Sequence, residues 1–172
     1  GKQVWHPHLT FFGFRYIKIL DFPGVPTVDN FNAIAVYSDI KQTGQVETSN
    51  TLLNQLISNI FWGQKDNFLD VPTDCPQRDE RLGWTGDATA FIKAASYNFD
   101  VKKFFEKWLT DMRLEQRPDG AINDVVPDYL NDGDVSAAWG DAITIIPWQL
   151  YQTYGDVTDL KDNFSSMKKW VE

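Results

Sequence analysis

The chain has 172 residues, of which 42% are hydrophobic and 15% aromatic, and 24 acidic against 16 basic residues leave a net charge of −8. This composition is typical of a globular protein that buries an apolar core, and the negative charge argues against a nucleic acid or an anionic membrane surface as partner. The single cysteine excludes an internal disulfide and a multi-cysteine zinc site, and no apolar run approaches the roughly 20 residues that a membrane-spanning helix needs.

The first part of the chain has the pattern of β-strands. Aromatic and β-branched residues are dense from Leu9 to Ile19, and part of this stretch alternates with a period of two. A second strand is expected from Ala33 to Tyr37, and turn residues such as Pro23 and Gly24 lie between the two. We therefore expect a short antiparallel β segment that ends near residue 45.

After this segment the hydrophobic period changes to the 3.6 residues of a helix, with Thr48 or Ser49 as the start of the first one. Two similar junctions, residues 97–101 and 154–157, each join an apolar helix to an amphipathic one. Such recurring helical hairpins are the units of an all-α toroid. Four further helices are expected, over residues 87–97, 101–114, 141–154 and 158–172.

Two long stretches, residues 69–85 and 117–138, lack a regular period and are rich in Asp, Gly and Pro. Long ordered loops on a helical scaffold are where functional sites are usually built. The first stretch and the residues directly after it concentrate carboxylates, because Asp74, Glu80 and Asp87 lie within fourteen residues.

Carboxyl groups gathered in this way can cleave a glycosidic bond. A protonated one donates its proton to the departing oxygen, while an ionised one stabilises positive charge on the sugar ring. Arg78 adds a fork of donors for sugar hydroxyls, and Trp84 adds a flat apolar face for sugar C–H groups. The alternative is structural, because the same charges can cap the helix near Asp87 and pair with Arg78 and Arg81 on the surface.

The run VPTDCPQRDERLGWTGD, residues 71–87, resembles the signature of family 78 glycoside hydrolases, the α-L-rhamnosidases. Shorter matches to this family extend over nearly the whole chain. They are GFRY at 13–16, VYSD at 36–39, LNQL at 53–56, WLTD at 108–111, WGDA at 139–142 and IPW at 146–148. A match of this length and specificity is not expected by chance.

The resemblance implies an (α/α)6 barrel preceded by β-sandwich domains. Residues 1–45 are then the C-terminal part of a β-sandwich domain with its linker, and residues 46–172 are the N-terminal half of the barrel. The expected fold is mainly α, a partial (α/α)6 toroid of helical hairpins preceded by a short antiparallel β segment. The chain begins without Met and stops inside a helical pattern, so we expect a segment of a longer polypeptide.

The resemblance also implies hydrolysis of terminal non-reducing α-L-rhamnosyl groups with inversion of anomeric configuration. Glu80 matches the general acid of the family, which protonates the departing oxygen. The general base of the family is a glutamate from a later part of the barrel, which no segment of this chain matches, so the chain alone is expected to be inactive. Five residues match sugar-binding positions of the family: Asp74, Arg78, Trp84, Asp87 and Trp139.

The partners implied are a rhamnose-containing oligosaccharide, polysaccharide or glycoside and the remainder of the longer polypeptide, and no cofactor is implied. No metal is expected either, because His6 and His8 lie on a short non-helical stretch without further histidines nearby. Cys75 is expected to be a small buried thiol, since no histidine lies in the motif to activate it. Asp141 is expected to be the first residue of a helix, where a carboxylate favours the dipole.

Two other functions are compatible with these residues. One is a non-catalytic module that binds rhamnose or another carbohydrate; Glu80 argues against it, because a binding module has no need of a proton donor. The other is a different glycosidase on the same toroid. Only the specific run from Asp74 to Asp87 argues against it, since a fold alone does not define a function.

Overall fold

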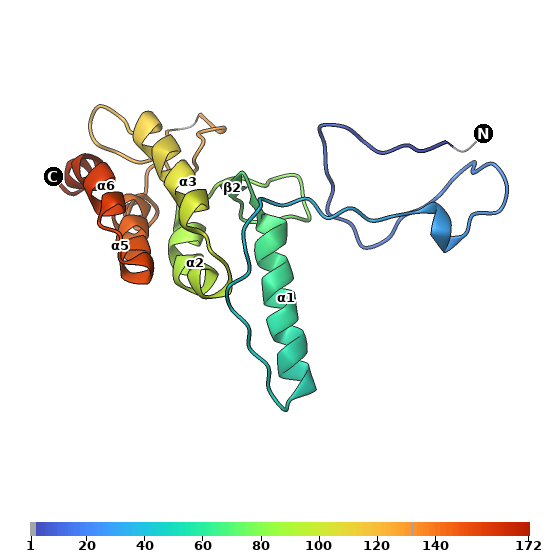
Figure 1. The fold of residues 1–172 in the computed structure, drawn as a ribbon. Coiled ribbons are helices and arrows are strands. Elements are labelled where there is room, and N and C mark those ends of the chain that lie inside the picture. Colours follow the sequence, from blue (N-terminus) through green and yellow to red (C-terminus); the bar gives the residue numbers. More distant parts are fainter. Residues whose placement is uncertain (1–2, 132) are drawn as a thin grey trace.

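The computed structural model describes residues 3–131 and 133–172, and the regular secondary structure of this part is mainly helical (Figure 1). Two strands of two residues each, β1 (Phe68–Leu69) and β2 (Val71–Pro72), pair antiparallel with Phe68 opposite Pro72. None of the described helices is long and apolar enough to cross a membrane. In chain order the helices are η1 (Val28–Asn30), α1 (Thr51–Asn67), α2 (Thr85–Asn98), α3 (Lys102–Glu115), α4 (Ala137–Gly140), α5 (Ala142–Tyr154) and α6 (Thr158–Val171).

Helix α1 begins at an asparagine cap. The Asn50 side chain accepts hydrogen bonds from the backbone N–H groups of Leu52 at 2.9 Å and Leu53 at 3.2 Å, which have no other partner in the first turn of a helix. The predicted cap at Thr48 or Ser49 is wrong by one or two residues, because the Thr48 hydroxyl instead donates to Oδ1 of Asn54 at 2.9 Å. The bounds of the four later predicted helices lie within two residues of those observed.

The apolar core lies where α2, α3 and α5 meet. Each of these helices contributes side chains that are at most 1% exposed: Ile92 of α2, Phe105 and Trp108 of α3, and Ile146 of α5. The indole Nε1 of Trp108 donates to the carbonyl oxygen of Val126 at 2.8 Å. This bond satisfies the one polar atom of the buried ring and ties the loop after α3 to the core, close to the start of α2.

The predicted antiparallel β segment is wrong. In the part of residues 1–45 that the structure describes, no strand forms, and an isolated bridge joins Gln42 to Phe99. Most of the segment runs as an extended arm away from the helices (Figure 1), with exposed apolar side chains, 63% for Phe12 and 83% for Tyr16. Near its end the chain returns to the helices, and Ile40 is buried in the core. An alternating pattern defines two faces, but a strand forms only where a second strand accepts its hydrogen bonds and a core covers its apolar face.

Candidate active site

The loop between β2 and α2, residues 73–84, is closed on itself by Asp74. The backbone N–H of Asp74 donates to the carbonyl oxygen of Leu82 at 3.1 Å, and the carboxylate Oδ1 of Asp74 accepts from the backbone N–H of Leu82 at 3.0 Å. Only 9% of the Asp74 side chain is exposed. These bonds hold residues 75–81 in a compact turn, within which Arg81 has a φ of 53°.

Four of the six predicted site residues form one hydrogen-bonded cluster in this loop. Glu80 accepts a hydrogen bond on Oε1 from Nε1 of Trp84 at 3.0 Å, and its Oε2 contacts Nη2 of Arg78. The same Arg78 nitrogen lies 3.4 Å from Oδ2 of Asp74. The carboxyl group of Glu80 therefore has a defined orientation, while 25% of its side chain stays exposed and accessible to a ligand.

Asp87 belongs to the same electrostatic environment but comes from the first turn of α2. Although its side chain reaches solvent, the protein around it removes part of its hydration and thereby raises the pKa of Asp87, and the negative charges of Asp74 and Glu80 raise this pKa further. Three carboxyl groups thus lie close enough to influence one another, as proton transfer or stabilisation of a cation requires.

Trp139, the sixth predicted site residue, reaches this region from α4. Its ring covers Gly86, because a Cβ atom built on Gly86 would lie 2.8 to 2.9 Å from atoms of the indole. The Nε1 atom of Trp139 is buried and has no hydrogen-bond partner among the described residues. The structure therefore places Trp139 against Gly86, which lies between Trp84 and Asp87, although more than fifty residues separate Trp139 from Gly86 in the sequence.

The N-terminal arm contacts the outer side of the loop. Arg81 donates from Nη1 to the carbonyl oxygen of Phe11 at 3.2 Å, and its guanidinium carbon lies 5.1 Å from the centre of the Phe11 ring. A Cβ atom on Gly13 would lie 2.4 Å from the carbonyl oxygen of Pro76, so the two backbones meet where only glycine fits. The sequence offered no signal for the Phe11 contact, which joins residues 70 positions apart.

Cys75 is buried, as expected, and its Sγ lies 3.3 Å from Nε of Arg78. One ligand atom each from Asp74, Cys75 and Glu80 lies within 4.8 Å of the others, a spacing that a metal ion can bridge. The Arg78 guanidinium, however, contacts all three groups. The protein thus supplies its own cation to this cluster. Contacts with Cys75 and Glu80 also raise the pKa of Arg78.

Asp141 lies at the junction of α4 and α5, where its side chain makes no capping hydrogen bond. Its Oδ1 instead accepts from Nε1 of Trp170 at 2.9 Å. The expected position of Asp141 at the start of a helix is confirmed, but the role of its carboxylate is to hold α6 against this junction.

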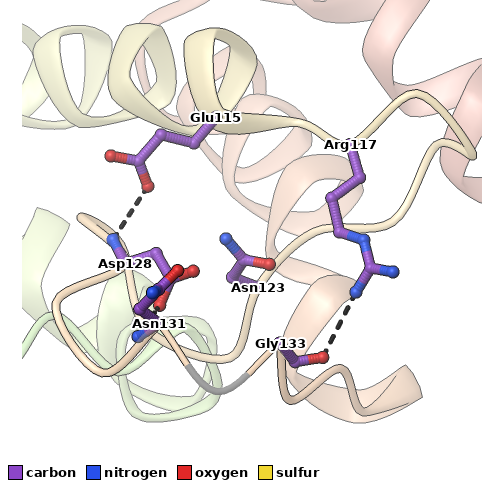
Figure 2. Close-up of a pocket in the computed structure, with 6 residues that line it drawn as sticks. All are labelled: Glu115, Arg117, Asn123, Asp128, Asn131 and Gly133. Atoms are coloured by element: carbon purple, nitrogen blue, oxygen red, sulfur yellow. Dashed lines mark hydrogen bonds between the residues drawn. The ribbon is translucent and has the colours of Figure 1, made fainter.

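A cavity of about 600 Å³ opens beside the loop that follows α3, and none of the six predicted site residues lines it. Figure 2 shows two hydrogen bonds across it: the Asp128 backbone N–H donates to Oε2 of Glu115 at 2.9 Å, and Nη1 of Arg117 donates to the carbonyl oxygen of Gly133 at 3.2 Å. These bonds attach the loop to the C-terminal end of α3. The loop that continues to α4 and Trp139 therefore has a fixed base.

A family model described as the bacterial alpha-L-rhamnosidase 6 hairpin glycosidase domain matches residues 41–172. An alpha-L-rhamnosidase of Formosa agariphila is 47% identical over 173 residues, which cover 99% of this chain and 19% of that protein. An alpha-L-rhamnosidase of Streptomyces avermitilis is 45% identical over 171 residues, which cover 99% of this chain and 17% of that protein. The chain therefore spans less than a fifth of the length of these relatives.

Solved structures show the same similarity. An alpha-L-rhamnosidase from Dictyoglumus thermophilum superimposes with a TM-score of 0.85 at 41% identity, over 88% of this chain and 17% of that one. The alpha-L-rhamnosidase of Streptomyces avermitilis, solved in complex with L-rhamnose, superimposes with a TM-score of 0.76 at 48% identity, over 78% of this chain and 13% of that one.

Proposed function

The chain belongs to the family of bacterial α-L-rhamnosidases with a six-hairpin glycosidase domain, and we propose on this basis that the complete protein containing it hydrolyses rhamnosides and releases their terminal non-reducing α-L-rhamnose. The hydrogen-bonded cluster of Asp74, Arg78, Glu80 and Trp84 carries the proposal. It combines an accessible carboxyl group, a cation and an aromatic ring, which are the groups that cleavage and recognition of a sugar require.

Glu80 is the general acid in this proposal. Its carboxyl group is held at both oxygens, by Trp84 on one and Arg78 on the other, and remains partly exposed. A donor held in this way can meet the glycosidic oxygen of a bound substrate in one orientation. Positioning and proton transfer together lower the barrier to departure of the aglycone.

The remaining five residues form the walls of the sugar site. Arg78, 62% exposed at its side chain, has free N–H groups for ring hydroxyls, and the carboxylates of Asp74 and Asp87 accept hydrogen bonds from hydroxyls and stabilise an oxocarbenium-like transition state. Trp84 and Trp139 offer apolar surfaces to the C–H groups and the methyl group of rhamnose.

An inverting mechanism needs a second carboxylate on the opposite face of the ring, about 6.5 to 9.5 Å from the acid, to leave room for the attacking water. The family's glutamate base is matched by none of these 172 residues, and the relatives are more than five times as long as the stretch that this chain aligns with. The base therefore belongs to a part of the polypeptide beyond this chain, and residues 46–172 supply the acid half of the barrel.

The longest natural polypeptide that contains this chain should be incubated with methyl α-L-rhamnoside, and the anomer formed first should be recorded by NMR. Early appearance of β-L-rhamnose is the expected result, because inversion at the anomeric carbon converts α to β. Early appearance of the α anomer would contradict inversion. Binding of rhamnose without hydrolysis would instead favour the non-catalytic carbohydrate-binding module.

A further inference from the structure

Asp124, in the loop between α3 and α4, joins two elements that carry different walls of the candidate site. Its backbone carbonyl accepts hydrogen bonds from both the N–H and the Oγ1 of Thr85, at 2.9 and 3.0 Å. Its carboxylate accepts from both the N–H and the Oγ of Ser136, each at 2.7 Å. One residue therefore binds the first residue of α2 and the residue that precedes α4.

The two residues held in this way lie close in sequence to the two tryptophans of the proposed sugar site. Thr85 follows Trp84, which itself forms an isolated antiparallel bridge with Val125, the residue after Asp124. Ser136 lies three positions before Trp139, whose ring covers Gly86. The only covalent path from Trp84 to Trp139 runs through α2, α3 and the long loop. Asp124 provides a short path of hydrogen bonds between them.

The carboxylate of Asp124 is suited to a fixed connection rather than to a solvated surface role. The residue is 8% exposed, and it forms no ion pair with any lysine or arginine in the described part of the chain. Its charge is stabilised by the two short hydrogen bonds from Ser136, and bonds to a charged acceptor are stronger than neutral ones. An unsatisfied buried carboxylate is costly, so the connection resists opening.

We infer that Asp124 is a positioning residue, which sets the distance between Trp139 and the Trp84 side of the sugar site while touching neither the sugar nor Glu80. This inference rests on the proposed function. The base of the loop is already attached to α3 through Glu115 and Arg117 (Figure 2). The contact that the Asp124 carboxylate adds is with Ser136, and it holds the start of α4.

The matched pair of variants is Asp124→Asn and Asp128→Asn, in the longest natural polypeptide that contains the chain. An asparagine at 124 keeps the backbone bonds to Thr85 but can accept from only one of the two Ser136 donors, and its NH2 group faces the other. Asp128 lies in the same loop, and among the described residues its carboxylate accepts from the nearby Asn131 N–H at 2.9 Å. Asp128→Asn therefore tests the general effect of losing a loop carboxylate.

We expect Asp124→Asn to raise KM for an aryl α-L-rhamnoside, and the Kd for free L-rhamnose measured by calorimetry, by roughly tenfold or more, since small misplacements in a site have large effects. The pH dependence of kcat should keep its wild-type shape, because Glu80 is untouched. Amide hydrogen exchange in a peptide covering residues 134–141 should accelerate. Asp128→Asn should match wild type in all four measurements.

A purely structural role would lower the melting temperature and the fraction of active protein while leaving KM and the rhamnose Kd unchanged, and this result would overturn the inference. If Asp124→Asn does not fold, Ser136→Ala, which removes one 2.7 Å bond, takes its place with the same expected changes at smaller size. Wild-type protein that neither cleaves rhamnosides nor binds rhamnose would refute the proposed function. Unchanged exchange of residues 134–141 in the variants would refute the positioning role independently of activity.

Discussion

Nε1 of Trp84 donates a 3.0 Å hydrogen bond to Oε1 of Glu80, and the two residues stand at the end of one loop, directly before α2 begins. The proposed sugar platform is thus also the group that orients the proposed acid. A shift of the ring would weaken this bond, so binding of the sugar and protonation of its leaving oxygen are coupled through it in the proposed mechanism.

Trp84→Phe separates the two roles, because phenylalanine keeps an aromatic face but has no donor. We expect kcat on an aryl α-L-rhamnoside to fall about ten- to a hundredfold, with a smaller change in KM. As Glu80 gives up its proton it becomes a carboxylate, which in the variant lacks a hydrogen bond of about 1.5 to 3 kcal/mol. Trp148→Phe is the matched control, since Trp148 is 50% exposed on α5 and its ring contacts Tyr151. An unchanged kcat for Trp84→Phe would show that the bond does not orient Glu80.

Glu80→Gln removes the proton and keeps the shape of the side chain, although its single amide oxygen can accept from only one of the two donors, Trp84 and Arg78. The loss of kcat/KM should depend on the leaving group: about a hundred- to ten-thousandfold for an alkyl rhamnoside, and far less for a dinitrophenyl rhamnoside, whose aglycone departs without protonation. Glu47→Gln, at an exposed position before α1, is the control. Equal losses on both substrates would argue that Glu80 supports the site without donating a proton.

Gly86→Ala tests the contact between α2 and Trp139. Alanine normally stabilises a helix interior by about 1 kcal/mol relative to glycine, but here its Cβ atom would lie 2.8 Å from the indole of Trp139. We expect weaker rhamnose binding by calorimetry and no gain in melting temperature. Gly63→Ala in α1, where no atom lies within 4 Å of the new Cβ, should show the ordinary gain in stability and wild-type binding.

We expect the stability of the protein to depend on pH through Asp159, a buried residue of α6 outside the candidate site. It is 4% exposed, and burial raises its pKa from 3.8 to about 6, an effect that nearby Lys102 offsets only in part and that Glu106 and Asp156 reinforce. The pKa of Asp159 is higher in the folded than in the unfolded protein, so folding favours the protonated form. The contribution of Asp159 to the free energy of unfolding is therefore fully present below pH 3.8 and is lost as the pH rises through about 6.

Asp159→Asn should therefore match wild type at pH 4 and have the higher melting temperature at pH 7, by an amount that corresponds to no more than about 3 kcal/mol. The pKa of Asp156 is shifted in the opposite direction, because hydrogen bonds from Lys102 and Thr158 lower it. The contribution of Asp156 to stability is therefore lost only as the pH falls below about 4. Asp162→Asn, on an exposed face of α6, is the control. A difference between Asp159→Asn and wild type that does not vary between pH 4 and pH 7 would contradict the raised pKa.

The amino-acid sequence by itself determined the five long helices after residue 50 and the central part of the site, but it missed the short helix α4, part of which was predicted as loop. A hydrophobic period of 3.6 depends on neighbours along the chain, so the bounds of α2, α3, α5 and α6 followed from local pattern. The run from Asp74 to Trp84 spans a single loop, so its members are close along the chain and contact one another within it. Their roles in catalysis and sugar binding stay predictions until the variants are measured.

Tertiary structure decided the features that depend on distant partners. Leu9 to Ile19 has the alternation of a strand, yet no second strand pairs with it in the described chain, because β hydrogen bonds are made between segments and not within one. Two contacts of the site join residues that are far apart in the sequence and share no local pattern. They are the packing of Trp139 on Gly86 and the hydrogen bonds of Asp124 with Thr85 and Ser136. Packing alone brings them together, and only coordinates reveal it.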